Sequence, residues 1–506
     1  MPELTQEHTA SRLSASLVGL FLGPVLVLLL LLIGPPATLV ESSGQAMPDA
    51  WIVLCLLVLM AVWWVTEALP IPVTSLLPMI VLPLAGVMSI SEASAPYMHP
   101  IIVLLMGGLI FAKAIEQWGL HERIALNFVA RTGGNPAGLI GGFMVAAAAL
   151  SMWISNSATS IMMMPIALSV AAAVETDPDQ SRRPFTWALL LGIVYACSIG
   201  GLGTPVGTPT NLIVLGYLND NSEASISFAQ WMSFGLPVVA VLVPLTWLIL
   251  TQWAFRMPKV DTQAAQKTVH ARLKDLGGLT SPEIRTLILF AVIASLWVFK
   301  SQLNALTLPI GEAGFKPLAG LTDHITAVIA VVLSFLIPAG GKDRQGQRLL
   351  TWEAAEAIPW GVLLLFGGGM SLALAISSSG LSTFLGESLA GLASLPLPVL
   401  ILLITAAVLG FTEVTSNIAT ASALMPVLGA VALESGLPLE VMAAPVALAA
   451  SCAFMLPMAT APNAIAYATG KVSLRTMAMA GFRVNLAALF LITAASIYLA
   501  PLALGS

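Results

Sequence analysis

Two short polar clusters interrupt apolar stretches of this chain, and both consist of residue types that bind small ions. Residues 155–159 read Ser-Asn-Ser-Ala-Thr, and residues 416–420 read Ser-Asn-Ile-Ala-Thr, 261 positions later. Each cluster follows a hydroxyl side chain four residues upstream, Ser151 in the first and Thr412 in the second. Polar groups inside hydrocarbon are costly unless they bind a ligand or a partner. Two copies at matching places therefore predict a duplicated transporter with one composite site.

A second pair of features consists of breaks rich in glycine and proline. Residues 200–209 read Gly-Gly-Leu-Gly-Thr-Pro-Val-Gly-Thr-Pro, and residues 456–462 read Leu-Pro-Met-Ala-Thr-Ala-Pro. Both residue types interrupt helices and leave carbonyls and amides without intrahelical partners. Such backbone is tolerated at membrane depth only where it lines a cavity or binds a ligand. Freed carbonyls with Ser, Thr and Asn oxygens suit a small cation such as Na⁺, and the helix starts after each break suit a carboxylate.

Simple helix–helix contact is the alternative explanation of these polar residues, since mid-membrane Ser, Thr and Asn often hydrogen-bond across a bundle. That explanation is preferred for one isolated cluster. Two clusters at repeat-equivalent places, each paired with a break, favour ligand binding instead. Glu413, beside Thr412, is interpreted as an internal hydrogen-bond partner in preference to a proton site. Glu67 is assigned a structural or gating role in preference to ligand contact.

Composition places the chain in a membrane. Of its 506 residues 58% are hydrophobic and only 9% are charged, whereas soluble proteins carry about 25% charge. The mean hydropathy is +0.94, and the long apolar runs indicate helices and not a β-barrel. No basic run suggests nucleic acid. No nucleotide-binding loop, metal-ligand spacing or nucleophile arrangement occurs, so we expect neither an enzyme nor a cofactor beyond a coupling ion.

The expected fold is an all-α polytopic membrane protein with eleven transmembrane helices and two re-entrant hairpins. The hairpins are residues 137–174 and 397–434, each with a polar cluster at its tip; two short full crossings are the alternative. The first apolar run is expected to be a retained helix, with a signal anchor as the alternative. The expected crossings are residues 17–33, 51–67, 73–88, 98–118, 185–218, 229–252, 284–300, 323–339, 357–377, 440–470 and 474–503.

Charge distribution predicts the orientation. With the N-terminus inside and eleven crossings, 18 of the 20 Lys and Arg residues fall on the inner side. Only Lys300 and Lys316 fall on the outer side, which matches the positive-inside rule. We therefore expect a multi-pass protein of the cell (inner) membrane with a cytoplasmic N-terminus and an external C-terminus.

The two halves repeat the same order of elements and face opposite ways, which indicates an inverted repeat. Residues 104–108 (Leu-Leu-Met-Gly-Gly) match residues 364–368 (Leu-Leu-Phe-Gly-Gly) at nearly the same spacing as the polar clusters. The expected divisions are an N-terminal helix, a first repeat, a polar cytoplasmic linker and a second repeat, at residues 1–50, 51–252, 253–283 and 284–506.

At these motifs the chain resembles the divalent anion/sodium symporter family, which takes up di- and tricarboxylates and, in some members, sulfate. The resemblance rests on Trp63–Pro78 (WWVTEALPIPVTSLLP), on the two Ser-Asn clusters, and on the breaks that end at Asn211 and Asn463. It implies a homodimer and an elevator motion, in which the hairpins and broken helices move as a transport domain against a fixed scaffold.

The resemblance also implies the site residues. The first sodium site would use Ser151, Ser155, Asn156 and the Gly207 carbonyl. The second would use Thr412, Thr415, Asn417 and the Ala459 carbonyl. Substrate carboxylates would contact Ser155, Asn156, Ser157, Thr208, Ser416 and Asn417, with Ala461 nearby. The chain departs from the family pattern at Ser157 and Ile418, where threonine is typical, and at Ala461, where many relatives have proline.

The expected function is Na⁺-coupled symport of a C4-dicarboxylate such as succinate, malate or fumarate across the bilayer. Two alternatives keep the fold: a Na⁺-independent dicarboxylate exchanger, and a transporter of sulfate or citrate. A channel is disfavoured because single-file conduction does not explain two inverted hairpins. A membrane enzyme or receptor is disfavoured because the polar residues lie at symmetric mid-membrane breaks.

Overall fold

The computed structural model describes most of the chain, and the regular elements in the described part are helices. Extended pairing there is limited to two isolated bridges, Leu308 with Phe315 and Pro338 with Arg348. The described residues are 2–37, 39–40, 45–132, 135–175, 183–222, 225–257, 262–309, 315–341, 346–385, 388 and 395–505, without the side chains of 2–15.

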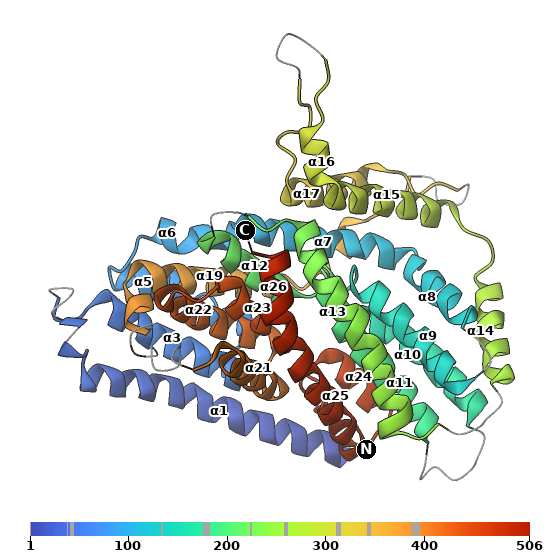
Figure 1. The fold of residues 1–506 in the computed structure, drawn as a ribbon, viewed down its shortest axis with the longest axis horizontal. Coiled ribbons are helices and arrows are strands. Elements are labelled where there is room, and N and C mark those ends of the chain that lie inside the picture. The colour runs from blue at the N-terminus through green and yellow to red at the C-terminus, as the bar shows by residue number, and fades with distance from the viewer. Residues whose placement is uncertain are drawn as a thin grey trace.

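One group of helices, which we call the hairpin body, contains both hairpins and both broken helices (Figure 1). Each hairpin consists of two arms: α9 (Pro136–Ser151) with α10 (Asn156–Val174), and α21 (Leu397–Val414) with α22 (Asn417–Ser435). The remaining members are α11 (Pro184–Gly200), η2 (Gly201–Gly203), α12 (Pro209–Asn221), α13 (Phe228–Leu248), η3 (Ile249–Ala254), α23 (Leu439–Ala450), α24 (Ala461–Ala468), α25 (Leu474–Ala494), η5 (Ala495–Leu499) and α26 (Ala500–Ala503).

A second group, which we call the frame, packs around the hairpin body. In Figure 1 its helices α7, α15 and α17 lie together along one edge, and α16 projects away from them. Its members are α1 (Pro2–Ile33), α3 (Asp49–Thr66), α4 (Ile71–Thr74), α5 (Leu77–Leu84), α6 (Ile90–Ser94), η1 (Ala95–Met98), α7 (Pro100–Gln117), α15 (Ser281–Val298), α16 (Lys300–Ala305), α17 (Asp323–Leu336), α18 (Trp352–Glu356) and α19 (Trp360–Ser378). Two polar-surfaced helices, α8 (Leu120–Ala130) and α14 (Gln263–Asp275), pack against α9 and α10.

The packing within the hairpin body has the reciprocity of an inverted repeat. The first arm of each hairpin packs against the first half of its own broken helix, α9 on α11 and α21 on α23. The second arm of each hairpin packs against the second half of the other broken helix, α10 on α24 and α22 on α12. Each repeat therefore packs against a helix of the other repeat, and this packing brings the hairpin tips and the breaks close together.

Three of the four hairpin arms are longer than the sequence suggests. The sequence predicts arms of about 15–16 apolar residues; α9 has 16 residues, but α10 and α22 have 19 each and α21 has 18. Proline does not shorten them, because Pro165 and Pro426 are accommodated inside α10 and α22. Arm length alone would permit full crossings, so the re-entrant character rests on where the two tips lie.

The expected crossing at residues 73–88 is interrupted in the structure. The segment forms α4 and α5 with a turn at Ser75 and Leu76, because prolines begin both helices. The turn is held by the frame: Trp64 Nε1 donates to Ser75 Oγ at 3.1 Å, and the Tyr97 hydroxyl donates to the Ser75 carbonyl. The prediction of one continuous helix here is therefore wrong.

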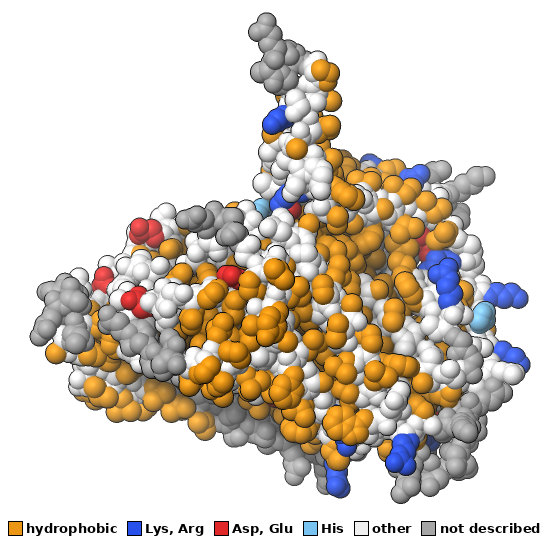
Figure 2. All heavy atoms as spheres, viewed as in Figure 1, with side chains coloured by type: hydrophobic (Ala, Val, Ile, Leu, Met, Phe, Trp, Pro, Cys, Tyr) orange, Lys and Arg blue, Asp and Glu red, His pale blue; other side chains and the backbone are white. Residues whose placement is uncertain are grey.

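The surface agrees with a membrane protein. Hydrophobic side chains cover the middle of the face in Figure 2, and charged side chains lie mainly toward its periphery. In the described part of the chain, eleven helices are long and apolar enough to cross a membrane. This set differs from our eleven crossings: it includes three hairpin arms, and it leaves out three shorter helical segments, namely Ile71–Leu84, α17 and α23. The three cysteines Cys55, Cys197 and Cys452 are buried and free.

Close backbone packing at the centre of the hairpin body makes Gly200 sensitive to substitution. A methyl group at Gly200 would lie 2.3 Å from the Ala148 carbonyl oxygen, so α9 and α11 would have to separate. We expect Gly200→Ala to lower the free energy of unfolding by about 1–3 kcal/mol, the usual cost of overpacking. Thermal unfolding in detergent measures this, with Gly410→Ala as the control because a methyl group there meets open space. Equal melting temperatures for the two variants would contradict the packing.

Candidate functional site

The two hairpin tips and the two breaks line one cavity of about 860 Å³. The lining from the tips is Ser155, Asn156, Ser157, Thr415, Ser416, Asn417 and Ile418, and the lining from the breaks is Gly207, Thr208, Ala459, Thr460 and Ala461. Residues separated by about 260 positions thus face the same hollow, as the inverted repeat predicts. All seven predicted substrate-contact residues are among them. The predicted cation ligands also line the cavity, except Ser151 and Thr412, which lie fully buried behind it.

The first hairpin tip gathers oxygens at a single place. The Ser151 hydroxyl donates to Asn156 Oδ1, and the Ser155 hydroxyl accepts from the Ala158 amide at 3.2 Å, which caps α10. A methyl group built on Gly201 would lie 3.0 Å from Asn156 Oδ1 and 3.1 Å from the Gly207 carbonyl oxygen. Two of the predicted cation ligands therefore converge on one small space beside the bare Cα of Gly201.

The second tip repeats this arrangement with one difference. The Thr412 hydroxyl lies 2.8 Å from Asn417 Oδ1 and 2.6 Å from the Ala450 carbonyl oxygen at the end of α23. The Thr415 hydroxyl contacts the Thr420 hydroxyl behind the tip. Ser416, unlike its counterpart Ser155, makes no side-chain capping bond. Its hydroxyl is therefore available to the cavity.

Each break is organised by one asparagine that we did not assign a role from the sequence. Asn211 Nδ2 donates to the carbonyls of Gly201 and Thr204, at 2.9 and 2.8 Å. Asn463 Nδ2 donates to carbonyls at the same two sequence offsets, those of Ala453 and Leu456, at 2.9 and 3.1 Å. Both asparagines are fully buried, and their occurrence at the end of both breaks was the available sequence signal.

The carboxylate of Glu413 fixes the second break. It accepts from the backbone amides of Phe454, Met455 and Leu456 at 2.8 to 3.2 Å. It also accepts from Asn485 Nδ2 on α25 at 2.6 Å. This network confirms the interpretation of Glu413 as an internal hydrogen-bond partner.

The second break also begins earlier than predicted. Helix α23 ends at Ala450, so the irregular backbone starts at Ser451 and not at Leu456. The Glu413 carboxylate accepts from the amides of residues 454–456, and Ser451 bonds to Thr210 in the first turn of α12, with 2.6 Å between the hydroxyl oxygens. The second break is therefore in direct contact with the helix that follows the first break.

The electrostatic potential in the cavity comes mainly from backbone dipoles and side-chain amides. Four helices begin at it, namely α10, α12, α22 and α24, and each presents the positive end of its dipole. Among the described residues of the lining, no Lys or Arg occurs, and Glu67 is the single ionisable side chain. The cavity can therefore bind an anion through helix N-termini and hydroxyls, and a cation through oxygens.

The departures from the family pattern all face the cavity. Ser157, Ile418 and Ala461 each line it, so each changes the shape or polarity offered to a ligand. Ser157 keeps a hydroxyl, whereas Ile418 presents a hydrocarbon surface beside Asn417. One wall is therefore more apolar than the other.

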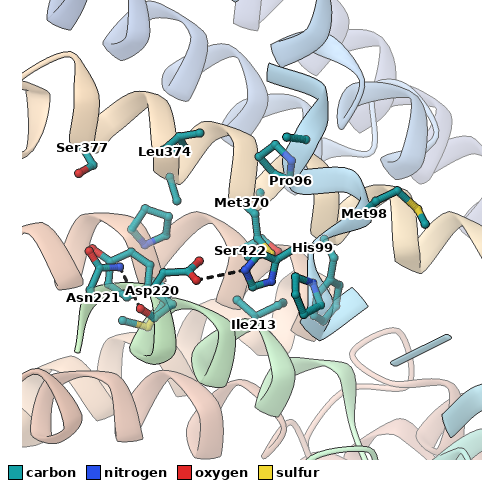
Figure 3. A pocket seen from close by; sticks show the side chains of 18 residues that line it. Pro96, Met98, His99, Ile213, Asp220, Asn221, Met370, Leu374, Ser377 and Ser422 are labelled. Carbon is teal, nitrogen blue, oxygen red and sulfur yellow. Dashed lines mark hydrogen bonds and ion pairs between the residues drawn. The ribbon is translucent and has the colours of Figure 1, made fainter. Parts of the chain in front are cut away.

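The hairpin body and the frame also contact each other near the C-terminal ends of α12 and α19. A second cavity of about 420 Å³ lies there, shown in Figure 3. His99, at the start of α7 in the frame, pairs with Asp220 near the end of α12 at 3.1 Å. Ser422 on α22 also faces this cavity, and its buried hydroxyl has no partner among the described contacts. No sequence pattern indicated this pairing.

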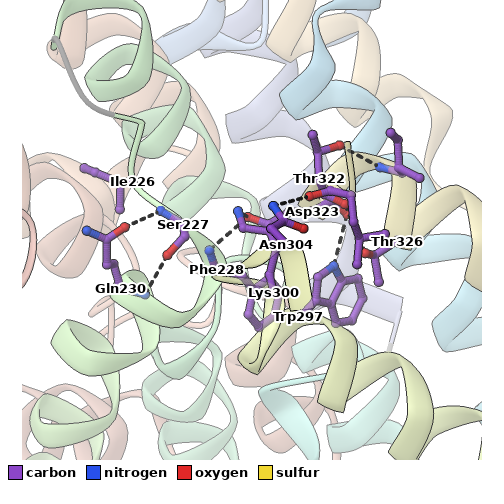
Figure 4. A network of polar contacts seen from close by, with 12 residues as sticks. Ile226, Ser227, Phe228, Gln230, Trp297, Lys300, Asn304, Thr322, Asp323 and Thr326 are labelled. Carbon is purple, nitrogen blue, oxygen red and sulfur yellow. Dashed lines mark hydrogen bonds and ion pairs between the residues drawn. The ribbon is translucent and has the colours of Figure 1, made fainter. Parts of the chain in front are cut away.

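A further contact between the two groups centres on Asp323 at the start of α17 (Figure 4). Its carboxylate accepts from the Phe228 amide, the first of α13, at 3.0 Å and from Lys300 Nζ at 2.8 Å. The Phe228 ring stacks on Trp297 of α15, with 4.7 Å between ring centroids. The frame therefore holds the start of α13.

Comparison with known proteins agrees with this geometry. Residues 15–504 match the protein family described as "sodium:sulfate symporter transmembrane region". The sodium-dependent dicarboxylate transporter SdcS of Staphylococcus saprophyticus is 39% identical over 97% of this chain and 92% of its own length. SdcS of Staphylococcus aureus strain MRSA252 is 38% identical with the same coverage.

Among solved structures, the Alcanivorax borkumensis YdaH transporter, noted for its unusual topology, aligns with a TM-score of 0.54. It is 14% identical and covers 89% of this chain and 97% of its own, so it supports the fold alone. The match over nearly the whole length, together with the paired tips and breaks around one cavity, gives the family: the chain belongs to the divalent anion/sodium symporter family of membrane transporters.

Proposed function

We propose that this protein is a secondary active transporter that couples Na⁺ entry to uptake of a C4-dicarboxylate such as succinate, malate or fumarate. The observation that carries the proposal is one cavity lined by both hairpin tips and both breaks, rich in oxygens and free of Lys and Arg among its described residues. The relatives named sodium-dependent dicarboxylate transporters support the same conclusion.

A dicarboxylate fits the paired construction of the cavity. Its two carboxylates need two separate sets of donors, and each Ser-Asn tip begins a helix whose first amides are free. We assign substrate contact to Ser155, Asn156, Ser157 and Thr208 on one side and to Ser416 and Asn417 on the other, with Ala461 close by. The negative charge is offset by helix dipoles and by the cations bound beside it.

The cations are assigned to the oxygen clusters behind each tip. The first cluster is Ser151, Ser155, Asn156 and the Gly207 carbonyl, and the second is Thr412, Thr415, Asn417 and the Ala459 carbonyl. Asn156 and Asn417 belong to both the cation and the anion sets. Binding of either ligand therefore preorganises the site for the other, which couples the two thermodynamically.

The transport movement is proposed to be an elevator, in which the hairpin body slides against the frame. The cavity lies between the two groups, since Glu67, Leu109 and Val362 of the frame also line it. With a cytoplasmic N-terminus, the cavity of this structure opens toward the cytoplasm, and the contacts of His99 and Asp323 close the outer end.

Reconstitution into proteoliposomes tests the proposal. Labelled succinate uptake is expected to require an inward Na⁺ gradient and to fall to background when choline replaces Na⁺. Uptake that is unaffected by Na⁺ would contradict the coupling. Uptake that requires internal dicarboxylate, regardless of Na⁺, would instead support the exchanger.

Sulfate or citrate as the substrate is distinguished by competition. Unlabelled succinate, malate and fumarate are expected to reduce succinate uptake, and to raise the melting temperature of the purified protein in Na⁺ by mass action. Sulfate or citrate competing more strongly would overturn the assignment. The homodimer stays a prediction that the mass of the purified protein in detergent tests.

A further inference from the structure

Glu67 occupies an unusual place for an acidic residue in an anion transporter. It is the single ionisable side chain among the described residues that line the cavity, and it is exposed to solvent. It directly follows the last turn of α3, two residues after Val65 and next to Thr66, which also line the cavity. A negative charge therefore lies at the rim of a site built for a dianion.

The frame holds this residue in place. Its backbone has φ 49° and ψ 38°, and it is the single non-glycine residue with positive φ in the described chain. Such a conformation costs energy outside glycine and persists only where the surroundings enforce it. Here the Ser16 hydroxyl of α1 donates to the Glu67 carbonyl at 3.2 Å, and the Ala68 amide donates to the Trp63 carbonyl at 3.2 Å. The backbone that carries the carboxylate is therefore held within the frame.

We propose that Glu67 is a fixed electrostatic element that promotes release of the substrate into the cytoplasm. Its carboxylate repels a dicarboxylate in the cavity, and thereby lowers the affinity of the inward-open site for the anion. This inference rests on the proposed function and orientation. It adds a residue that makes the affinity for substrate differ between the two sides of the membrane.

The repulsion acts on one side of the membrane only. The tips that bind substrate belong to the hairpin body, whereas Glu67 belongs to the frame. An elevator movement toward the outer side would carry the tips away from Glu67, and Coulomb energy falls with distance and with hydration. The affinity of the outward-open site is therefore unaffected by Glu67, while that of the inward-open site is reduced.

A charge series at residue 67 in oriented membrane vesicles tests this. Inside-out vesicles expose the inner face, and right-side-out vesicles the outer face. We expect E67Q to lower the inner-face KM for succinate by about three- to tenfold, as estimated for one carboxylate acting on a dianion across a partly hydrated cavity. E67K is expected to lower it further, and the outer-face KM is expected to change by less than about twofold for both variants.

Two controls separate charge from shape. E67D keeps the charge in a residue that accepts this backbone conformation, so it should retain the wild-type inner-face KM. E353Q removes an exposed charge on α18 away from the cavity and should change neither KM. Wild-type transport with an inner-face KM unchanged in E67Q and E67K would overturn this inference alone. Wild-type protein without Na⁺-driven succinate transport would overturn the proposed function and this inference with it.

Discussion

Alanine in place of Asn156 or Asn417 is expected to abolish Na⁺-driven succinate uptake. Each side chain accepts from a buried hydroxyl, Ser151 or Thr412, and begins a helix at the cavity. Loss of one amide removes a ligand from a proposed cation site and from the anion site. Hydrogen bonds to charged groups contribute about 1.5–3 kcal/mol each. Two lost contacts correspond to a fall of roughly a hundredfold to ten-thousandfold in transport.

The matched control is Asn127→Ala on α8. That amide donates to the Arg123 carbonyl of its own helix at 2.8 Å and does not line the cavity. Its removal should leave uptake near wild type. Initial rates in proteoliposomes, with melting temperatures for all three variants, measure the difference. Substantial uptake by well-folded Asn156→Ala or Asn417→Ala would place the ligands elsewhere.

Replacement of Glu413 by alanine is expected to eliminate transport through loss of the second break's structure. Its carboxylate accepts bonds from three successive amides and from Asn485, all in the interior of the hairpin body. A buried donor left without an acceptor costs about 1–3 kcal/mol. Loss of an acceptor shared by several such donors is therefore expected to remove a large part of the free energy of unfolding. Glu413→Gln is expected to be damaging too, because its NH₂ group would face amide donors.

Thermal unfolding and uptake together test this role. Glu413 variants are expected to lose melting temperature and transport in parallel, whereas Glu434→Gln, an exposed change on α22, should preserve both. A proton-carrying role makes the opposite prediction. Glu413→Gln would then keep a wild-type melting temperature, and its uptake would lose its dependence on pH.

Most of the membrane architecture could be predicted from the sequence, because the patterns that indicate it are local. Runs of apolar residues, the excess of Lys and Arg on alternate loops, and Gly or Pro inside apolar stretches each act within a few residues. The hairpin tips and the first break were therefore placed where the structure has them, whereas the second break begins earlier than predicted, at Ser451. The interruption at Ser75 was missed because the prolines around it occur in an otherwise continuous apolar run.

The site was predicted in part, and the omissions have a common cause. The paired Ser-Asn clusters identified the tips, and the resemblance to a family supplied the ligand sets. The partners of Glu413 lie 41 to 72 positions away in the chain. The pairing of His99 with Asp220 joins the frame to the hairpin body, which local pattern does not reveal. The choice between a proton site and a structural carboxylate at Glu413 therefore had to wait for the packing.

By itself, the sequence determined that this protein is a helical membrane transporter built from two inverted halves, because hydrophobicity, charge bias and repeated breaks are written along the chain. Only the tertiary structure decided that both tips and both breaks share one cavity, that Glu413 and two buried asparagines organise the breaks, and that the Glu67 carboxylate lies at the rim. Those features depend on which helices pack together, and packing energies are summed over contacts between residues far apart in sequence.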